Sequence, residues 1–340
     1  MDCPQRQILL LACAAACSSA ADAPAVVSRI REHMREYVNQ LPDYTCRITL
    51  ERYRRPRAGV PFELSDRLRL EVAYTGGDEL YSWPGDDRFE GGIEDLLPGR
   101  GMVSNGSYAL HIRNLFVREI AEFAAPVEEQ CEGAACVRVD FRIPAVRSGY
   151  ALSSGSGSAP VPLVGSAWFA VVSLDIQRLE VRVDDPPRSV RVTSTRETTN
   201  YVRARFGDVE FVVPGSNELT LRDRDGSESR NQVRFDHYRR FAGNATVFYA
   251  PDAGIPASST PPAKEPKARA PKPGVVSLDA EIGEDAAIGD PFTATAPGGT
   301  KVTGRITNMR RAGKLWMVDV KVGGTARRGL TLPLKAGVKL

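Results

Sequence analysis

Apolar and polar residues alternate with a period of two along most of the chain between residues 45 and 240. Cys46, Ile48 and Leu50 alternate with polar or charged neighbours, and the same pattern recurs from Val137 to Ile143. Strict alternation indicates strands with one buried and one solvated face, which is typical of antiparallel sheets. The pattern predicts a large curved sheet with strands near 45–51, 67–72, 137–143, 179–183, 189–203, 209–213, 217–223, 230–238 and 245–250.

Two segments have the period of a helix instead. Residues 24–40 place Val27, Ile30, Met34 and Val38 on one side, and residues 108–123 carry a second apolar stripe. Two such helices would cover the apolar side of the sheet. We therefore expect an α+β fold, in which two helices cover a large curved antiparallel sheet and a small all-β module follows at the C-terminal end.

The first 23 residues have the pattern of a signal peptide. A short start with Arg6 leads into an apolar run from Ile8 to Cys17, and small residues follow up to Ala23. About 20 apolar residues are needed to cross a bilayer, so this run is too short to serve as a membrane span. The pattern predicts an exported or secreted protein of the periplasm or cell envelope whose mature chain begins near Pro24.

Lipidation is an alternative to simple cleavage. Cys13 and Cys17 each follow small or apolar residues, as the acylated cysteine of a lipoprotein signal does. Cys13 has the better-matched tetrapeptide but leaves a short apolar segment before it, whereas Cys17 has the length but lacks the usual Leu. The protein would associate with a membrane only if one of them is lipidated.

The C-terminal third differs in composition from the rest. Residues 251–274 contain seven prolines and no apolar period, which predicts a disordered linker. Residues 275–323 contain short alternating runs that predict a small β module, and residues 324–340 form a basic tail. Residues 264–340 carry 14 basic and 7 acidic side chains. This positive surface is either ordinary solvated surface or a contact for anionic lipid or polysaccharide, and nucleic acid is not expected in an exported protein.

Three cysteines remain after signal removal. Cys131 and Cys136 are five residues apart, and in an exported chain this spacing predicts a local disulfide that closes a hairpin. A redox or metal site would need a different spacing and a nearby histidine. Cys46 has no expected partner and lies on the apolar side of its strand, so we expect a buried free thiol.

Catalytic motifs are not found in the sequence. His33, His111 and His237 are far apart, and there is no zinc-protease pattern, nucleophile elbow or phosphate-binding loop. We therefore expect a non-enzymatic protein without a cofactor or metal. An acidic group could supply paired carboxylates or bind calcium, although a solvated loop also explains it; its members are Asp86, Asp87, Glu90, Glu94 and Asp95. The segment from Asp223 to Gly226 resembles the start of a calcium loop, but a hairpin turn explains it.

The order of the expected elements over residues 24–250 resembles the periplasmic lipoprotein carriers. The passages that carry this resemblance are Asp78–Trp83 and the hairpin Gly165–Val183. Leu41–Cys46 and Glu228–Asn231 also look like an uncharacterised family of exported bacterial proteins, and Leu278–Ile282 and Ala287–Pro291 are similar to small barrel modules of envelope assemblies. The carrier resemblance implies an incomplete barrel that holds an apolar cavity.

These expectations leave three functions open. The first is a periplasmic or envelope-associated binding protein that carries a hydrophobic ligand or a lipoprotein acyl chain, with the helices at 24–40 and 108–123 as its gate. The second is an assembly or interaction module with a fully packed core and an envelope protein as its partner. The third is a hydrolase that uses the carboxylates at 86–95. The sequence does not identify ligand-binding residues or an oligomeric state.

Overall fold

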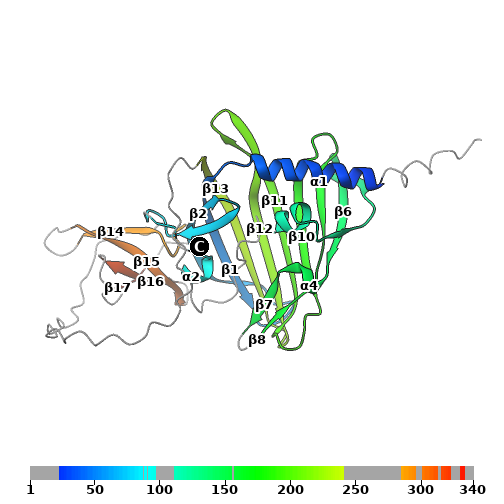
Figure 1. Cartoon of the computed structure of the whole chain (residues 1–340). Coiled ribbons are helices and arrows are strands. Elements are labelled where there is room, and N and C mark those ends of the chain that lie inside the picture. The colour runs from blue at the N-terminus through cyan, green and yellow to red at the C-terminus, as the bar shows by residue number, and fades with distance from the viewer. Residues whose placement is uncertain are drawn as a thin grey trace, which may run out of the picture. The chain divides into compact units, whose positions relative to one another are not determined.

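The computed structural model describes residues 23–86, 88–89, 91–96, 111–154, 157–240, 285–295, 301–312, 315–322 and 330–333. The chain divides into two compact units, 1–240 and 241–340 (Figure 1). We describe each unit by itself. Several expectations lie outside the described residues: the signal peptide, Cys13, Cys17, the strand at 245–250 and the linker at 251–274 remain predictions.

The first unit is built on one large open antiparallel sheet, as the alternation predicts. Its strand order is β3-β2-β1-β13-β12-β11-β10-β9-β6-β4, with β5 paired to β6, so eleven strands are joined within the described part of the chain. The strands are β1 (Tyr44–Arg55), β2 (Glu63–Thr75), β3 (Asp78–Ser82), β4 (Glu122–Phe123), β5 (Val127–Cys131), β6 (Ala134–Ile143), β9 (Leu163–Ala170), β10 (Ile176–Asp184), β11 (Val192–Phe206), β12 (Val209–Asp223) and β13 (Glu228–Arg240). The first strand therefore pairs with the last long one, and β3 and β4 lie at opposite ends of the order.

The buried side of this sheet, called the inner face below, follows from the strand register. Residues that pair across eight neighbouring strands form one continuous buried row: Val139, Ala167, Leu179, Thr199, Asn217, Val233, Leu50 and Leu68. The adjacent row passes through Gly165, where a Cβ atom would lie 1.9 Å from the Glu180 carbonyl oxygen and 2.7 Å from the Phe141 ring. Glycine is required there because the backbone of Glu180 on the neighbouring strand, and then the Phe141 ring, leave no room for a Cβ atom.

Helix α1 (Ala23–Gln40) covers part of the inner face, close to the expected bounds of 24–40. Figure 1 shows it lying across β10, β11 and β12 near one end of the strands. Ile30 and Met34 are buried in the same apolar cluster as Leu179 and Val139. Polar contacts hold the helix at its middle and near its C-terminal end, since Arg31 donates to the Ala121 carbonyl (3.1 Å) and Tyr37 donates to the Val212 carbonyl.

The second helix is shorter than the predicted span of 108–123. Residues 108–110 lie outside the description, and the π-helical turn η1 runs from Arg113 to Val117. The chain then reverses at Glu119, which has a φ of 54°, and Phe123 enters β4 to pair with Phe141. The apolar period continues past Val117 because Phe123 packs on Phe116, with ring centroids 5.7 Å apart, although it does so from a strand. A helical turn followed by a strand therefore buries the same apolar side chains that one longer helix over 108–123 would bury.

Three local predictions have clear outcomes. The turn at Asp225-Gly226 is confirmed: Gly226 has a φ of 84°, and Asp225 accepts hydrogen bonds from Ser227, so this acidic segment serves the β12–β13 hairpin. The strands expected at 209–213 and 217–223 are one strand, β12, with a register shift opposite Asn200 and Tyr201. The sequence Gly-Ser-Gly-Ser-Ala at 155–159 predicts a flexible turn, but residues 157–159 belong to β8 (Gly157–Pro160), which pairs with β7 (Ala151–Ser154) in a second small sheet.

Two further helices of the first unit are short. Helices α2 (Ile93–Leu96) and α4 (Ala145–Ser148) are single turns. The second unit contains a four-stranded antiparallel sheet of β14 (Pro291–Thr295), β15 (Lys301–Ala312), β16 (Leu315–Val322) and β17 (Leu330–Pro333). Strand β17 falls within the segment expected to be a basic tail. Among the described residues, no helix has the length and apolar character of a membrane span.

Candidate functional site

The inner face carries a group of buried polar side chains where apolar ones are expected. The inner polar patch comprises Thr195, Glu197 and Thr199 on β11, Asn217 on β12 and Asn231 on β13, all of which are buried. The register pairs Thr199 with Asn217 and places Leu219 between Glu197 and Asn231. The patch therefore interrupts the apolar rows in the middle of the sheet.

Hydrogen bonds connect three members of this patch with one another and with His111, which lies two residues before η1. Asn217 Nδ2 donates to Glu197 Oε1 (2.9 Å) and to Thr199 Oγ1 (3.0 Å). The other oxygen of Glu197, Oε2, lies 3.3 Å from His111 Nε2. Because the Glu197 oxygen accepts, the Asn217 amide must turn its nitrogen toward Glu197 and its oxygen away. The orientation of the Asn217 side chain is thus set by Glu197.

Two buried polar atoms of this region have no hydrogen-bond partner in the described part of the chain. They are Asn217 Oδ1 and Tyr201 Oη, and the Asn217 side chain as a whole is only 2% exposed. The other partnerless atoms among the described residues are guanidinium nitrogens and the Gln177 amide oxygen. Leaving a buried amide or hydroxyl unpaired costs about 1–3 kcal/mol, so each such atom requires an explanation.

Tyrosines and apolar side chains surround the patch. Tyr201 follows Thr199 on the same strand, and both Tyr201 and Tyr150 pack against the apolar cluster that contains Leu179 and Val181. Burial raises the pKa of both tyrosines, and the nearby Glu197 carboxyl raises it further for Tyr150. Their hydroxyls therefore remain protonated at neutral pH. The Tyr150 ring also lies 5.9 Å from the His111 ring, centroid to centroid.

An aromatic cluster lies on the sheet where α1 ends and β1 begins. Tyr44 stacks on Tyr74 (5.2 Å between centroids) and also contacts Phe206 (5.7 Å) and Tyr238 (5.4 Å). Cys46, two residues into β1 from Tyr44, is a buried free cysteine as predicted, and burial raises the pKa of its thiol. At neutral pH this thiol is protonated and acts as a small apolar group.

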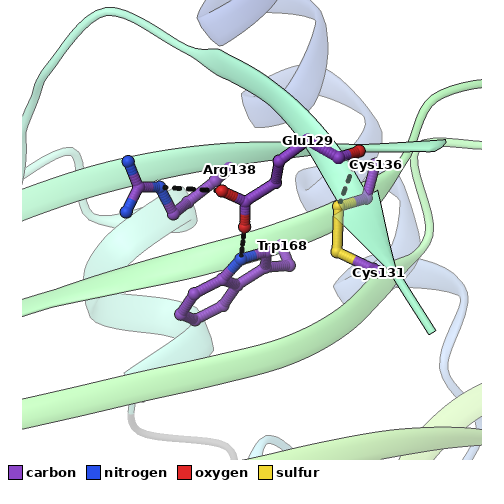
Figure 2. The surroundings of a disulfide bond; sticks show 5 residues. All are labelled: Glu129, Cys131, Cys136, Arg138 and Trp168. Atoms are coloured by element: carbon purple, nitrogen blue, oxygen red, sulfur yellow. Dashed lines mark hydrogen bonds and ion pairs between the residues drawn. A yellow bond between two sulfur atoms is a disulfide. The ribbon is translucent and has the colours of Figure 1, made fainter. Parts of the chain in front are cut away.

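The predicted disulfide between Cys131 and Cys136 is confirmed. It joins β5 to β6 across the turn at Glu132-Gly133, and its Cα atoms are 5.8 Å apart. Figure 2 shows Glu129 beside it, accepting from the Trp168 indole and facing Arg138 at 3.7 Å. Glu129, Cys131 and Cys136 bring three potential metal-binding groups within 4.8 Å, but the disulfide occupies both sulfurs. The grouping is therefore structural in the oxidised protein.

The structure separates the other predicted site residues. Asp86 is exposed, Asp87 and Glu90 lie outside the described residues, and the side chains of Glu94 and Asp95 are not described, so a carboxylate site at 86–95 remains a prediction. The three histidines face three different carboxylates: His33 faces Asp175 (3.6 Å), His111 faces Glu197, and His237 lies beside Asp236 (2.5 Å).

The inner polar patch was not predicted from the sequence, although one signal for it exists. Thr195, Glu197 and Thr199 occupy alternate positions of a strand, in phase with Tyr201 rather than with the exposed Arg196 and Asn200. Three polar residues on the buried side of a strand are unusual and indicate a polar group within the core. The register to Asn217 and the contact with His111 required the tertiary structure.

Comparisons with known proteins place the chain near three solved structures. A DUF1329 family protein from Desulfovibrio piger is 13% identical, covers 66% of this chain and 95% of its own, and has a TM-score of 0.34. The lipoprotein LppX from Mycobacterium tuberculosis is 13% identical, covers 65% of this chain and 98% of its own, and has a TM-score of 0.25. LprF from Mycobacterium bovis is 11% identical, covers 68% of this chain and 98% of its own, and has a TM-score of 0.23. No family model and no curated protein matches the chain. All three TM-scores lie below 0.5.

Proposed function

We propose that the first unit binds a hydrophobic molecule non-covalently on the inner face of its sheet. The observation that carries this proposal is the inner polar patch, where Asn217 Oδ1 and Tyr201 Oη are buried among apolar side chains without a partner. A core selected only for stability would replace such groups by apolar ones, because unpaired polar atoms destabilise the folded state. Buried polar groups within an apolar surface are the usual composition of a small-molecule site.

The architecture supports the same proposal. The sheet is open, and the buried row from Val139 to Leu68 crosses eight strands and is apolar except at Thr199 and Asn217. Helix α1 and η1 cover one part of that face, through Ile30, Met34 and Phe116. We infer that movement of these two elements would admit a ligand. The exported location and the carrier role expected from the sequence are part of this proposal.

A first experiment compares the mass of the full chain, purified from its source cells, under native and denaturing conditions. A non-covalent mass that disappears on denaturation supports the proposal. A covalent excess equal to a diacylglycerol plus an acyl group would show lipidation instead, a separate property of the N-terminal cysteines. A polypeptide mass without additions in both spectra leads to the binding assay that follows.

The decisive assay is saturable binding of the apolar fluorophore N-phenyl-1-naphthylamine. Leu219→Gln places a polar amide on the inner face between Glu197 and Asn231 and is expected to weaken the binding at least several-fold. Thr220→Gln, the next residue on the opposite face, is the matched control and should leave binding unchanged. Thermal melting verifies that both variants are folded. Absence of saturable binding to the wild-type protein would overturn the proposal in favour of an assembly module with a packed core.

A further inference from the structure

We infer that the inner polar patch selects a ligand whose apolar body carries a neutral hydroxyl or amide group, and that it rejects carboxylate and phosphate head groups. This inference rests on the proposed function and specifies the ligand class. The two partnerless atoms define what the head group must offer. Asn217 Oδ1 can only accept a hydrogen bond, whereas Tyr201 Oη can both donate and accept.

A hydroxyl or a primary amide meets both requirements at once. Each can donate to Asn217 Oδ1 while it accepts from the Tyr201 hydroxyl. The two side chains are close in the sheet, because Asn217 pairs with Thr199 and Tyr201 is the next inward residue on the same strand as Thr199. The register shift after Asn200 puts Tyr201 opposite Pro214, so Asn217 and Tyr201 are separated by one step across the sheet and two residues along β11. This corresponds to about 8 Å between their backbones, a distance that two side chains and one small polar group can span.

The charges of the patch disfavour an anionic head group. Glu197 already presents its carboxyl to the Asn217 amide and to His111, and a second acidic group nearby would meet it in a region of low dielectric constant. The one basic side chain described at the patch, His111, is already opposed by Glu197 at 3.3 Å. A buried anion would therefore lack a free counter-charge, which is strongly unfavourable.

Two hydrogen bonds also fix the orientation of the Asn217 amide, so that its oxygen is available to the head group. Its nitrogen is occupied by Glu197 and Thr199, so its oxygen cannot exchange with the nitrogen by rotation without losing two hydrogen bonds. An acceptor whose direction is set in advance loses little side-chain freedom when a ligand binds. The structure thus assigns Glu197 and Thr199 as positioning residues and Asn217 as the contact.

The test compares three ligands that share one 18-carbon chain: oleyl alcohol, oleamide and oleate. The affinity of each ligand is measured by its displacement of N-phenyl-1-naphthylamine from the full chain at pH 8, with each ligand kept below its own critical micelle concentration. We expect the alcohol and the amide to bind at least about tenfold more tightly than oleate, which corresponds to one buried polar contact and the absence of a counter-charge. Equal affinities, or tighter binding of oleate, would overturn the inference while leaving the proposed function intact. A protein that binds none of the three and no fluorophore would contradict the proposed function itself.

Three variants locate the selectivity. Asn217→Leu and Tyr201→Phe each remove one partner of the head group and should weaken oleyl alcohol binding several-fold, with little change for oleate or the fluorophore. Asn200→Leu is the matched control, because Asn200 directly precedes Tyr201 on β11 but is exposed on the outer face of the sheet. If both inner variants retain the wild-type preference, the patch does not contact the head group. Tyr201→Phe keeps this test decisive if Asn217→Leu fails to fold, since it removes only an atom without a partner.

Discussion

The two faces of the large sheet treat polar side chains in opposite ways. On the outer face, acidic groups are surrounded by arginines: Glu180 faces Arg178 (3.2 Å), Arg182 (3.6 Å) and Arg196 (3.8 Å). On the inner face, Glu197 accepts from the Asn217 amide and lies 3.3 Å from His111 Nε2, and the oxygen of that amide has no hydrogen-bond partner in the described part of the chain. The outer acidic groups are therefore paired with arginines, whereas the inner face leaves an amide oxygen and a hydroxyl without a hydrogen-bond partner among the described residues.

Glu228 shows how completely an outer acidic group can be paired. It is 4% exposed, and it accepts from Arg55 Nε (2.7 Å) and Arg222 Nε (2.9 Å) on the two neighbouring strands. Burial by itself would raise its pKa, but the hydrogen bonds and charges of the two arginines outweigh burial and hold the pKa of Glu228 below its usual value. This pairing contributes to folding, while the inner patch contributes to binding in our proposal. Four measurements can test this division.

The largest effect is expected for the apolar part of the inner face. Phe116 is fully buried against Phe123 and Phe169, so Phe116→Ala should lower the free energy of unfolding by about 3–5 kcal/mol. Urea denaturation measures this loss. The exposed Val172 (95%) is the control, and Val172→Ala should change the free energy by no more than about 0.5 kcal/mol. Equal effects at the two positions would contradict the assigned core.

The second effect concerns the outer ion pairs. Glu228→Gln should cost about 2–3 kcal/mol at pH 7, because two arginines lose their shared carboxylate. The pKa of Glu228 is lower in the folded than in the unfolded protein, so its contribution is present above the unfolded pKa and is lost as pH falls through the folded value. Urea denaturation at pH 7 and at pH 3 should therefore show the difference between wild type and variant shrinking at acidic pH. A difference that does not depend on pH would exclude the carboxylate as its source.

A third, similar or smaller effect is expected for the disulfide. It closes a short loop, so replacing Cys131 and Cys136 together by serine should destabilise the protein by about 2 kcal/mol. Melting with and without a reductant checks the assignment, because the reductant should lower the melting temperature of the wild type and leave that of the double variant unchanged. A shift in the variant would indicate a different origin.

The smallest effect is expected for the buried Tyr201 hydroxyl on the inner face. Tyr201→Phe removes a buried hydroxyl without a partner, so it should change the free energy of unfolding by less than about 1 kcal/mol and in the stabilising direction. Tyr37→Phe is the matched control: it removes a hydroxyl that donates to the Val212 carbonyl and should destabilise by about 1 kcal/mol. Loss of stability in Tyr201→Phe equal to that of Tyr37→Phe would show that Tyr201 has a structural partner after all.

Much of the fold was predictable because local patterns determine it. The alternation from Val137 to Ile143 predicts which residues of β6 are buried, and the spacing of Ile30 and Met34 predicts the buried side of α1. The second helix was predicted too long, because Phe123 continues the apolar period from β4. A periodic pattern reports which side chains are buried, and two different backbones can bury the same set.

The sequence by itself determined the alternating faces of the strands, the covering helix α1, the hairpin turn at Gly226 and the Cys131–Cys136 bridge, because each depends on residues close together in the chain. Only the tertiary structure decided the candidate site. His111 and Glu197 are 86 residues apart, and Asn217 meets Thr199 through strand register. Such contacts arise from long-range pairing, and whether a buried polar atom finds a partner depends on every element packed around it.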